Sequence, residues 1–144
     1  MIYWLTGQPG AGKTTLAKYL TEYFPKDNVI HIDGDDLRDV FKNKDYSITG
    51  RRLNIQRAQY IAQFMHSQGY DVIVSLVSPY RDQREYFKTE MGENIKEIYV
   101  HTTQDRGRNH FHVEGYEPPL ENFVDCDSTD SDEHETFQKI RKHL

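Results

Sequence analysis

The chain alternates between short hydrophobic runs and segments in which hydrophobic residues recur at helical spacing. Five runs have the length and apolar character of buried strands: 2–5, 29–32, 72–77, 95–100 and, more weakly, 123–126. Helical spacing appears in segments that begin near positions 16, 54 and 137. Strands that alternate with helices form a parallel sheet with helices on both faces. The pattern therefore predicts an α/β fold built on a five-stranded parallel sheet.

Residues that begin or end helices bound these segments. Pro25 ends the first helix, and Gly69 stands where the C-terminal cap of the next long helix belongs. Ser78 and Pro79 are the residue types of an N-cap and a first helical position, so we expect a helix from there to about Gly92. The run 95–100 is a weaker strand prediction because two of its residues are charged.

A chain of 144 residues is near the usual size of one domain, so we expect a single domain over 1–144. The segment 101–119 has little apolar content and no periodicity. In a compact domain such a loop is usually functional, and often it is a lid. We therefore expect a lid-like loop at about 101–119.

Composition and charge exclude several classes of function. The formal net charge is -5, which argues against a protein that coats nucleic acid or a membrane. The apolar N-terminal run is much too short for a signal-peptide core, and no stretch approaches the length that spans a membrane. Cys126, the single cysteine, cannot form an internal disulfide, and we expect a buried thiol there. The simplest location is the cytoplasm.

The segment 7–14, Gly-Gln-Pro-Gly-Ala-Gly-Lys-Thr, matches the phosphate-binding pattern G-x-x-x-x-G-K-[ST] completely. Its glycines let backbone N–H groups surround the phosphates, Lys13 brings a positive charge to the β and γ phosphates, and the Thr14 hydroxyl can ligate Mg²⁺. A predicted strand precedes the loop and a helix follows it, so the positive end of that helix faces the anion. The predicted phosphate-binding residues are Gly7, Gly10, Ala11, Gly12, Lys13, Thr14 and Thr15.

This loop alone does not distinguish a kinase from a GTPase, a motor or a sensor. A GTPase of this type needs a base-reading motif of the N-K-x-D kind, and the chain has none. A motor needs a longer chain. The remaining prediction is a small kinase that uses ATP and Mg²⁺.

Four further segments make a more specific match: 33–38 (Asp-Gly-Asp-Asp-Leu-Arg), 51–55 (Arg-Arg-Leu-Asn-Ile), 75–81 (Ser-Leu-Val-Ser-Pro-Tyr-Arg) and 115–119 (Gly-Tyr-Glu-Pro-Pro). With the phosphate loop, and in the same order over most of the chain, they resemble the adenylylsulfate kinase family. Those enzymes phosphorylate the 3′-hydroxyl of adenosine 5′-phosphosulfate (APS). The resemblance implies a P-loop nucleotide-kinase fold and a small-molecule nucleotide as the phosphate acceptor.

The resemblance also implies a catalytic role for Asp33 and Asp35, together with Lys13. The two carboxylates follow the second predicted strand, at the edge where parallel sheets place their ligands. One can accept the proton of the attacking hydroxyl, and one can hold Mg²⁺ or orient its water. The resemblance puts the base at Asp33, with Asp35 as its partner. It leaves open the reverse assignment, in which Asp33 holds the metal with Thr14.

An acceptor site follows from the same resemblance. Arg51 and Asn54 are three residues apart, so one helix face presents both, and a guanidinium fork suits a pair of phosphate or sulfate oxygens. The residues that match the family's acceptor positions are Asp35, Arg38, Tyr46, Arg51, Asn54, Ser78 and Arg81. Tyr46 stands where the family places an aromatic ring against the acceptor base. Ser78 is also compatible with a helix cap, and Arg81 with an arginine on a helix surface.

The chain departs from the family in its lid. The Lys-Gly-Leu-Tyr segment of the usual lid is absent between His101 and Gly115, and the lid is shorter. Arg106 or, as the alternative, Arg108 is expected to cover ATP. Because lids often complete substrate recognition, the departure affects the identity of the acceptor and not the kinase prediction. A more open pocket has room for a group larger than sulfate.

Three functions are therefore compared. A kinase for APS is preferred. The alternative is a kinase for another nucleotide-linked metabolite, such as a cytidine diphosphate conjugate of the cytidine diphosphoramidate type. An ATP-binding module without turnover is disfavoured, because a sensor has no use for the acidic pair at 33 and 35. A polynucleotide kinase is disfavoured by the acidic charge, and we expect no nucleic-acid or membrane partner. A homodimer stays open.

Overall fold

The computed structural model describes residues 1–144, except for the side chain of Lys26. Its five strands form one sheet: β1 (Ile2–Thr6), β2 (Val29–Asp33), β3 (Asp71–Ser75), β4 (Ile95–His101) and β5 (Val124–Asp127). Neighbouring strands are all parallel, in the order β2-β3-β1-β4-β5. This arrangement confirms the α/β fold with a five-stranded parallel sheet.

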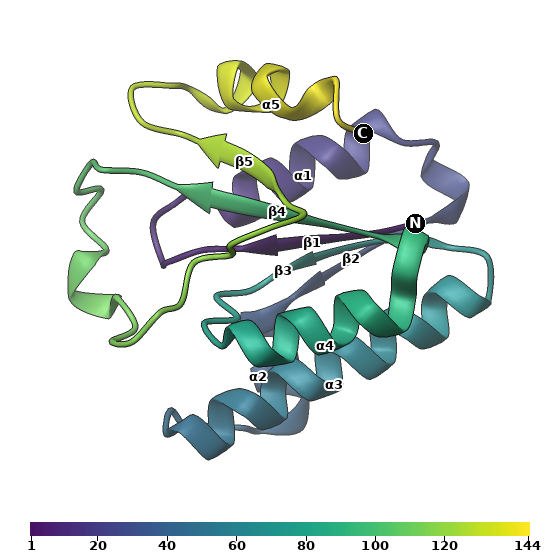
Figure 1. Cartoon of the computed structure of the whole chain (residues 1–144), viewed down its shortest axis with the longest axis horizontal. Helices are drawn as coiled ribbons and strands as arrows, with labels where there is room; N and C mark the ends of the chain where they lie inside the picture. Colours follow the sequence, from purple (N-terminus) through teal and green to yellow (C-terminus); the bar gives the residue numbers. More distant parts are fainter.

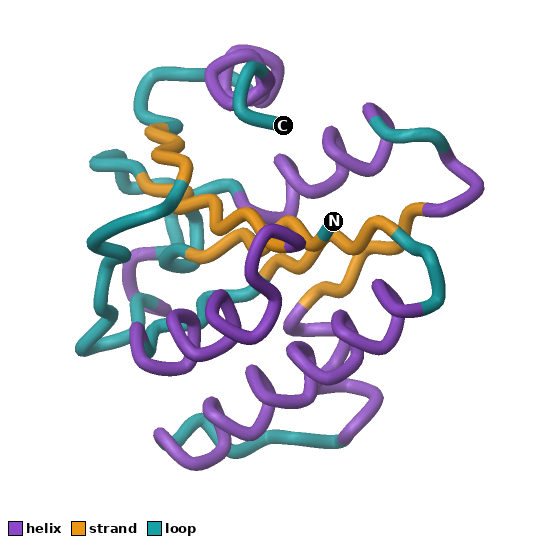
Figure 2. Tube along the Cα trace, turned by 45° about the vertical axis from the view of Figure 1, so that its right-hand side comes forward, coloured by secondary structure: helices purple, strands orange, loops and turns teal.

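Helices cover both faces of the sheet, as Figures 1 and 2 show. On one face lie α1 (Lys13–Tyr23) and α5 (Glu133–Arg141). On the other lie α2 (Gly34–Phe41), α3 (Ile48–Ser67) and α4 (Arg81–Met91). Three short 3-10 helices complete the chain: η1 (Lys26–Asn28), η2 (Gly92–Asn94) and η3 (Asn109–Phe111).

The hydrophobic core has two halves, one on each face of the sheet. Side chains along a strand point alternately to opposite faces. Trp4 and Val74 accordingly pack toward α3 and α4, whereas Leu5 and Ile73 pack toward α1 and α5. Cys126 is fully buried in the second half, and burial raises the pKa of its thiol to about 12. The expected buried thiol is confirmed.

The starts of α2 and α3 differ from the sequence expectation. α3 begins at Ile48, six positions before the expected start at Asn54, and the hydroxyl of Ser47 accepts the N–H of Gly50 as its N-cap. The helix α2 was not expected at all. The side chain of Asp33 caps it by accepting the N–H of Asp35, and the acidic first turn suits the positive end of a helix.

The helix α4 begins at Arg81 with Tyr80 as its N-cap, so the expectation that Ser78 and Pro79 open it is wrong. The strand before it ends at Ser75 and does not reach Val77. Ser78 instead has a φ of 47°, in the left-handed region that non-glycine residues rarely adopt. Its buried backbone therefore belongs to a constrained loop between β3 and α4.

All five strands end at the same edge of the sheet, at the left of Figure 1. The phosphate loop follows β1 at this edge, and the loop from β4 to β5 crosses it. Parallel sheets bind their ligands at this edge.

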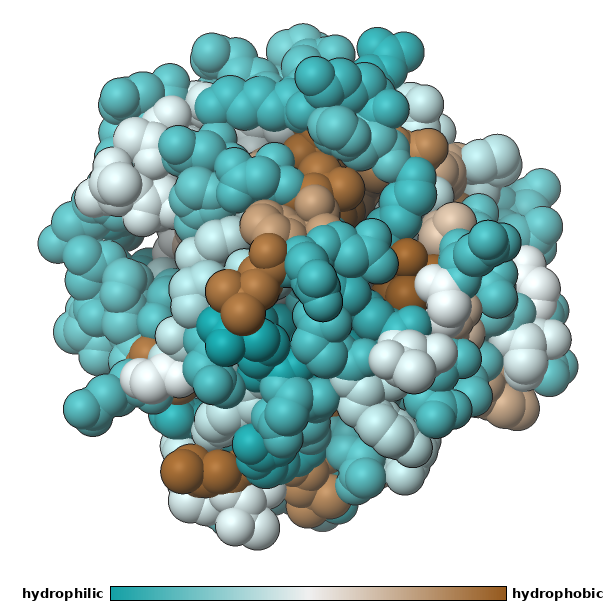
Figure 3. Space-filling model, viewed as in Figure 1, coloured by the Kyte–Doolittle hydropathy of each residue, from teal (hydrophilic) through white to brown (hydrophobic). Residues whose placement is uncertain are grey.

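The molecular surface is polar over most of the face in Figure 3, where hydrophobic residues form small separate patches. Among the described residues, no helix has the length and apolar character needed to cross a membrane.

Candidate active site

The phosphate loop connects the end of β1 to the first turn of α1. Gly7 is required by close packing, because a Cβ at this position would lie 2.1 Å from the carbonyl oxygen of Val100 on β4. Gly12 has a φ of 102° and is the N-cap of α1. The backbone N–H of Gly7 donates to the carbonyl of Val77, 3.3 Å away, beyond the end of β3. These contacts fix the phosphate loop, and with it the N-terminus of α1, against β4 and the segment that follows β3.

Lys13 lies on the first turn of α1 and is nine-tenths buried, with its Nζ donating to the carbonyl oxygen of Gln8 at 3.0 Å. Burial lowers the pKa of its ammonium to about 8, although the carboxylates of Asp33 and Asp35 favour the charged form. A phosphate that entered the loop would favour the charged ammonium in the same way.

Asp33 is the last residue of β2, and its carboxylate contacts both the phosphate loop and the end of β3. Its Oδ2 accepts the Thr14 hydroxyl at 3.0 Å and the Ser75 hydroxyl at 3.1 Å. Its Oδ1 accepts the backbone N–H of Asp35 at 2.9 Å. Both carboxylate oxygens are therefore in use. The side chain of Asp35 is exposed in the first turn of α2 and makes no hydrogen bond with the described residues.

The pair Thr14 and Asp33 fits the needs of a magnesium ion. Mg²⁺ usually keeps several waters and takes one or two protein oxygens together with substrate phosphates. A threonine hydroxyl and a carboxylate that already contact one another, beside the phosphate loop, provide such oxygens. The fit supports the two residues that the sequence suggested for the metal.

A cavity of about 980 Å³ extends from the phosphate loop across the ends of β2 and β3 to α2 and α3. A cavity of this size accommodates a small ligand with several ring systems. It brings together most of the predicted site residues: Gly10, Gly12, Lys13, Thr14, Thr15, Asp33, Asp35, Arg38, Tyr46, Arg51, Asn54, Ser78 and Arg106. Of the other predicted residues, Gly7 and Ala11 lie in the phosphate loop without lining this cavity.

Two arginines on the acceptor side differ in how they are held. The guanidinium of Arg38 uses Nη1 to reach the carbonyls of Asn43 and Asp45, at 3.2 and 3.1 Å, and lies 4.1 Å from the ring centre of Tyr46. Arg51 lines the cavity from α3, and its guanidinium makes no hydrogen bond or ion pair with the described residues. Arg51 is thus the guanidinium that a ligand can engage without displacing a protein contact.

Asn54 and Ser78 each present an unpartnered polar atom that is fully buried. The Nδ2 of Asn54 donates to the Gly34 carbonyl at 3.3 Å, but its Oδ1 has no partner. The Ser78 Oγ also lacks one. Both residues line the large cavity. Because buried polar groups are nearly always satisfied, these two atoms indicate positions where a ligand or an ordered water donates or accepts.

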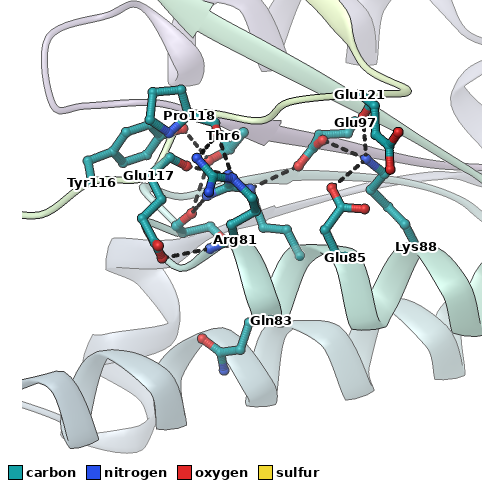
Figure 4. A network of polar contacts seen from close by, with 12 residues as sticks. Thr6, Arg81, Gln83, Glu85, Lys88, Glu97, Tyr116, Glu117, Pro118 and Glu121 are labelled. Atoms are coloured by element: carbon teal, nitrogen blue, oxygen red, sulfur yellow. Dashed lines mark hydrogen bonds and ion pairs between the residues drawn. The ribbon is translucent and has the colours of Figure 1, made fainter.

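Arg81 is the one predicted acceptor residue that does not line the cavity. Its Nε and Nη2 donate to the Pro118 carbonyl at 2.9 and 2.7 Å, and its backbone N–H donates to the Glu117 side chain. Figure 4 shows Arg81 beside Glu117 and Pro118. This placement does not support the expectation that Arg81 binds the acceptor, because its guanidinium already holds the loop.

The lid-like loop is anchored on the phosphate loop. The Gln8 side chain donates to the Val113 carbonyl at 2.9 Å and accepts the Val113 N–H at 2.8 Å. Arg106 reaches the carbonyls of Gly10 and Ala11 at 3.4 Å and the Ser128 carbonyl at 2.6 Å. The lid-like loop is therefore held against one side of the phosphate loop.

A second cavity of about 510 Å³ lies between α1, the start of α5 and the base of the lid. Thr15 and Arg106 line it as well as the larger cavity. Two cavities therefore meet at the phosphate loop.

The side chains that line the large cavity carry a net positive charge, whereas the net charge of the whole chain is negative. Its basic side chains are Lys13, Arg38, Arg51, Arg106 and Arg108, and its carboxylates are Asp33, Asp35 and Asp39. The chain as a whole carries a formal charge of -5. A cleft with an excess of one sign concentrates ligands of the opposite sign, so this cavity favours an anion.

Three residues of the site were missed in the sequence. Ser75 holds Asp33, Gln8 holds the lid, and the hydroxyl of Ser128 donates to the Ala11 carbonyl at 2.7 Å. Gln8 stands at a variable position of the phosphate-loop pattern, and the other two lie at strand ends. Only their place at the carboxyl edge of the sheet could have suggested them.

Comparison with known proteins identifies the family. The family model described as adenylylsulphate kinase matches residues 1–117. The chain belongs to the adenylylsulphate kinase family. The match covers the phosphate loop, the acidic pair and the arginine–asparagine pair of α3, which are the segments that form the large cavity.

Individual relatives agree with this family. The chain is 34% identical to the adenylyl-sulfate kinase of Buchnera aphidicola over 106 residues, which are 71% of this chain and 52% of the relative. It thus spans about half the length of that curated relative. It is 32% identical to the cytidine diphosphoramidate kinase of Campylobacter jejuni over 133 residues, 88% of this chain and 77% of the relative.

The fold agrees as well. The APS kinase of Mycobacterium tuberculosis, solved in complex with AMPPNP and APS, superposes with a TM-score of 0.83. The match covers 98% of this chain and 95% of the other at 22% identity.

Replacement of Lys13 by alanine should lower turnover about a hundredfold or more, because the ammonium neutralises charge that develops on the transferred phosphate. The measurement is ADP release together with circular dichroism, which should show an intact fold. Lys18→Ala is the matched control, since Lys18 is an exposed lysine on the same helix. Turnover of Lys13→Ala within about tenfold of the parent would contradict this role of Lys13.

Proposed function

We propose that this chain transfers the γ-phosphate of ATP to the ribose 3′-hydroxyl of APS. The observation that carries the proposal is the single cavity in which the phosphate loop faces the acidic pair and the Arg51–Asn54 pair. A donor bound at the phosphate loop and an acceptor bound beside α3 would thereby share one space. Membership of the adenylylsulphate kinase family supports the same reaction.

The donor nucleotide is proposed to bind across both cavities. Its phosphates would lie on the N-terminus of α1 and on Lys13, where backbone N–H groups and the ammonium balance their charge. Its base would occupy the smaller cavity, between Arg106 and the start of α5. Arg106 contacts both spaces and would cover the nucleotide where they join.

Transfer of the phosphate requires positioning, charge neutralisation and removal of one proton from the acceptor hydroxyl. Thr14 and Asp33 would hold Mg²⁺, which neutralises charge on the β and γ phosphates when it is bound. Asp33 already uses both oxygens in hydrogen bonds, whereas the carboxylate of Asp35 makes no hydrogen bond with the residues that the structure describes. This difference supports Asp35 as the proton acceptor, the reverse of the assignment that the family resemblance placed first.

The acceptor is proposed to lie between α2 and α3. Arg51 would take an anionic group of the nucleotide, because its guanidinium is uncommitted and its fork suits two oxygens of a phosphate or sulfate. The unpartnered Oδ1 of Asn54 would accept a hydrogen bond from the same ligand. The ring of Tyr46, backed by Arg38, would stack on the base.

A cytidine diphosphate conjugate is the second candidate for the acceptor. The Campylobacter jejuni relative named cytidine diphosphoramidate kinase matches more of this chain, and more of its own length, than the Buchnera relative does. The short lid is compatible with a larger group in the pocket. The residues proposed for the donor site and for proton removal are the same for both acceptors.

The proposal is tested by ADP release with a panel of acceptors that includes APS and cytidine diphosphoramidate. We expect APS to be turned over with the highest kcat/KM, and phosphorus NMR of the product to place the new phosphate on the ribose 3′ position. A higher kcat/KM with the cytidine conjugate than with APS would show that the second candidate is the acceptor. Phosphate on a 5′ end of DNA or RNA, or ADP release that no acceptor stimulates, would refute the proposal.

Asparagine variants of the acidic pair separate the two carboxylate roles. Asp35→Asn should lower kcat about a hundredfold or more with ATP affinity unchanged, because the amide keeps the shape and loses the proton acceptor. Asp33→Asn should instead raise the Mg²⁺ concentration needed for half-maximal rate. The measurements are initial rates over a range of Mg²⁺ and equilibrium binding of AMPPNP. The opposite pattern would restore Asp33 as the base.

Substitution of lysine for Arg51 should raise the KM of the acceptor about tenfold or more, or about 1.4 kcal/mol, because lysine cannot bind two oxygens as a fork. The KM of ATP should stay within about twofold of the parent, since Arg51 lines the cavity from α3 and not from the phosphate loop. Arg57→Lys is the matched control, because Arg57 also lies on α3 but stacks over Phe41 at 4.3 Å and does not line the cavity. Equal effects of the two variants would exclude the role of Arg51.

A further inference from the structure

The loop 76–79 lines the large cavity and is called the acceptor wall here. Behind it lies a buried network of charged side chains that the reaction itself does not use. Arg84 on α4 and Glu97 on β4 each expose 1% of their side chain, and Nε of Arg84 donates to Glu97 at 2.9 Å. Lys88, one turn further along α4, donates to the other oxygen of Glu97 at 2.9 Å and to the Glu121 carbonyl at 3.0 Å. Figure 4 shows Lys88, Glu85 and Glu97 grouped on one side of the network.

Arg84 links this network to two loops of the active site. Its Nη1 donates to the Ser78 carbonyl at 2.6 Å, and its Nη2 donates to the Glu117 carbonyl. Its guanidinium carbon also lies 5.5 Å from the ring centre of Tyr116. One side chain thus bonds in three directions, to the sheet, to the acceptor wall and to the end of the lid-like loop.

The bond to Ser78 explains how a strained backbone is maintained. A residue with a side chain at a φ of 47° costs energy, and it persists only where its surroundings hold it. The Ser78 carbonyl accepts Arg84, and it lies 3.2 Å from the Thr6 hydroxyl, whose shorter hydrogen bond is to the neighbouring Val77 carbonyl at 2.7 Å. In this conformation Ser78 lines the large cavity, and its Oγ is buried without a partner.

The segment 116–118 at the end of the lid is fixed on the same loop. The Glu117 N–H donates to the Pro79 carbonyl at 2.9 Å, and Arg81 holds Pro118. The Tyr116 hydroxyl lies 2.8 Å from the Thr6 hydroxyl, and burial raises its pKa to about 12, so it remains protonated. Three residues before this segment, Val113 is bonded to the phosphate loop. A short stretch of chain therefore connects the acceptor wall to the donor site.

We propose that Arg84 is a positioning residue that couples the lid to the acceptor wall, by holding the Ser78 and Glu117 carbonyls in one guanidinium. The inference rests on the proposed function for its kinetic consequence only. Arg84 touches neither nucleotide site directly, because it does not line either cavity. It acts through the backbone of Ser78 and through the position of the lid.

The test variant is Arg84→Lys. Lysine keeps the positive charge that Glu97 needs inside the protein, so the buried pair is not left uncompensated. Lysine has a single side-chain nitrogen, however, so it lacks the planar fork with which arginine reaches the oxygens of Glu97, Ser78 and Glu117 at the same time. We expect kcat with the acceptor to fall about a hundredfold, as small displacements of positioning groups can cause. AMPPNP affinity should stay within about twofold of the parent, because the phosphate loop keeps its own contacts.

Lys88→Met is the matched control, since Lys88 shares Glu97 but contacts neither Ser78 nor Glu117. It should lower the melting temperature at least as much as Arg84→Lys while kcat stays within about threefold of the parent. A loss of kcat in Lys88→Met equal to that in Arg84→Lys would reduce Arg84 to a structural role and overturn the proposal.

Amide hydrogen exchange tests the coupling without reference to any acceptor. In the parent, AMPPNP should slow exchange both in 113–118 and in 76–80. In Arg84→Lys, exchange in these two segments should be faster, and AMPPNP should no longer protect 76–80. Unchanged exchange in this variant would overturn the proposal even if turnover fell. A parent protein that phosphorylates no acceptor would refute the proposed function and leave the exchange experiment valid.

Discussion

The parallel arrangement of the sheet requires every strand to end at one edge, where the backbone groups that follow have no strand to pair with. Buried backbone donors and acceptors need partners, and here side chains supply them. Thr6 donates to the Val77 carbonyl at 2.7 Å, Ser128 donates to Ala11, and the Gln8 amide pairs with Val113 in both directions. The loops that surround the ligand are therefore held by polar contacts, and the same contacts give the site its shape.

The strands and the phosphate loop could be predicted from the sequence because their signals are local. Buried parallel strands are continuous apolar runs, and the phosphate loop carries its own pattern of residues. The helix α2 was missed because it has eight residues and only one large buried apolar side chain, Leu37. The sequence favoured a catalytic role over a capping role for the acidic pair, and the structure shows that Asp33 is the N-cap of α2.

Other features could not be predicted because they depend on contacts between distant segments. Ser78 precedes a proline and has the residue type of an N-cap, but its φ is set by Thr6 and Arg84 from other parts of the chain. Glu97 weakened the prediction of β4, since a charged residue in a buried strand is unusual. The structure resolves this conflict by pairing Glu97 with Arg84 and Lys88. In the sequence, these two basic residues are indistinguishable from the exposed charges of α4.

The distinction between Arg38 and Arg51 has the same origin. Both matched acceptor positions of the family, and nothing local separates them. In the fold, Nη1 of Arg38 is used by the loop that follows α2, and its guanidinium backs the ring of Tyr46. Arg51 retains its whole guanidinium for a ligand. One arginine thus shapes the pocket and the other is free to bind an anion, although the two look equivalent in a motif.

The positions of the charged side chains also favour a small acceptor. An acidic chain that gathers five basic side chains in one cavity attracts an anion there and repels a long polyanion elsewhere on its surface. The lid reinforces this selection, because it is bonded to the phosphate loop at Val113 and to the acceptor wall at Glu117. Both attachments lie at the C-terminal end of the lid, so they hold this end beside the cavity. The combination favours a small nucleotide with concentrated negative charge over any nucleic acid.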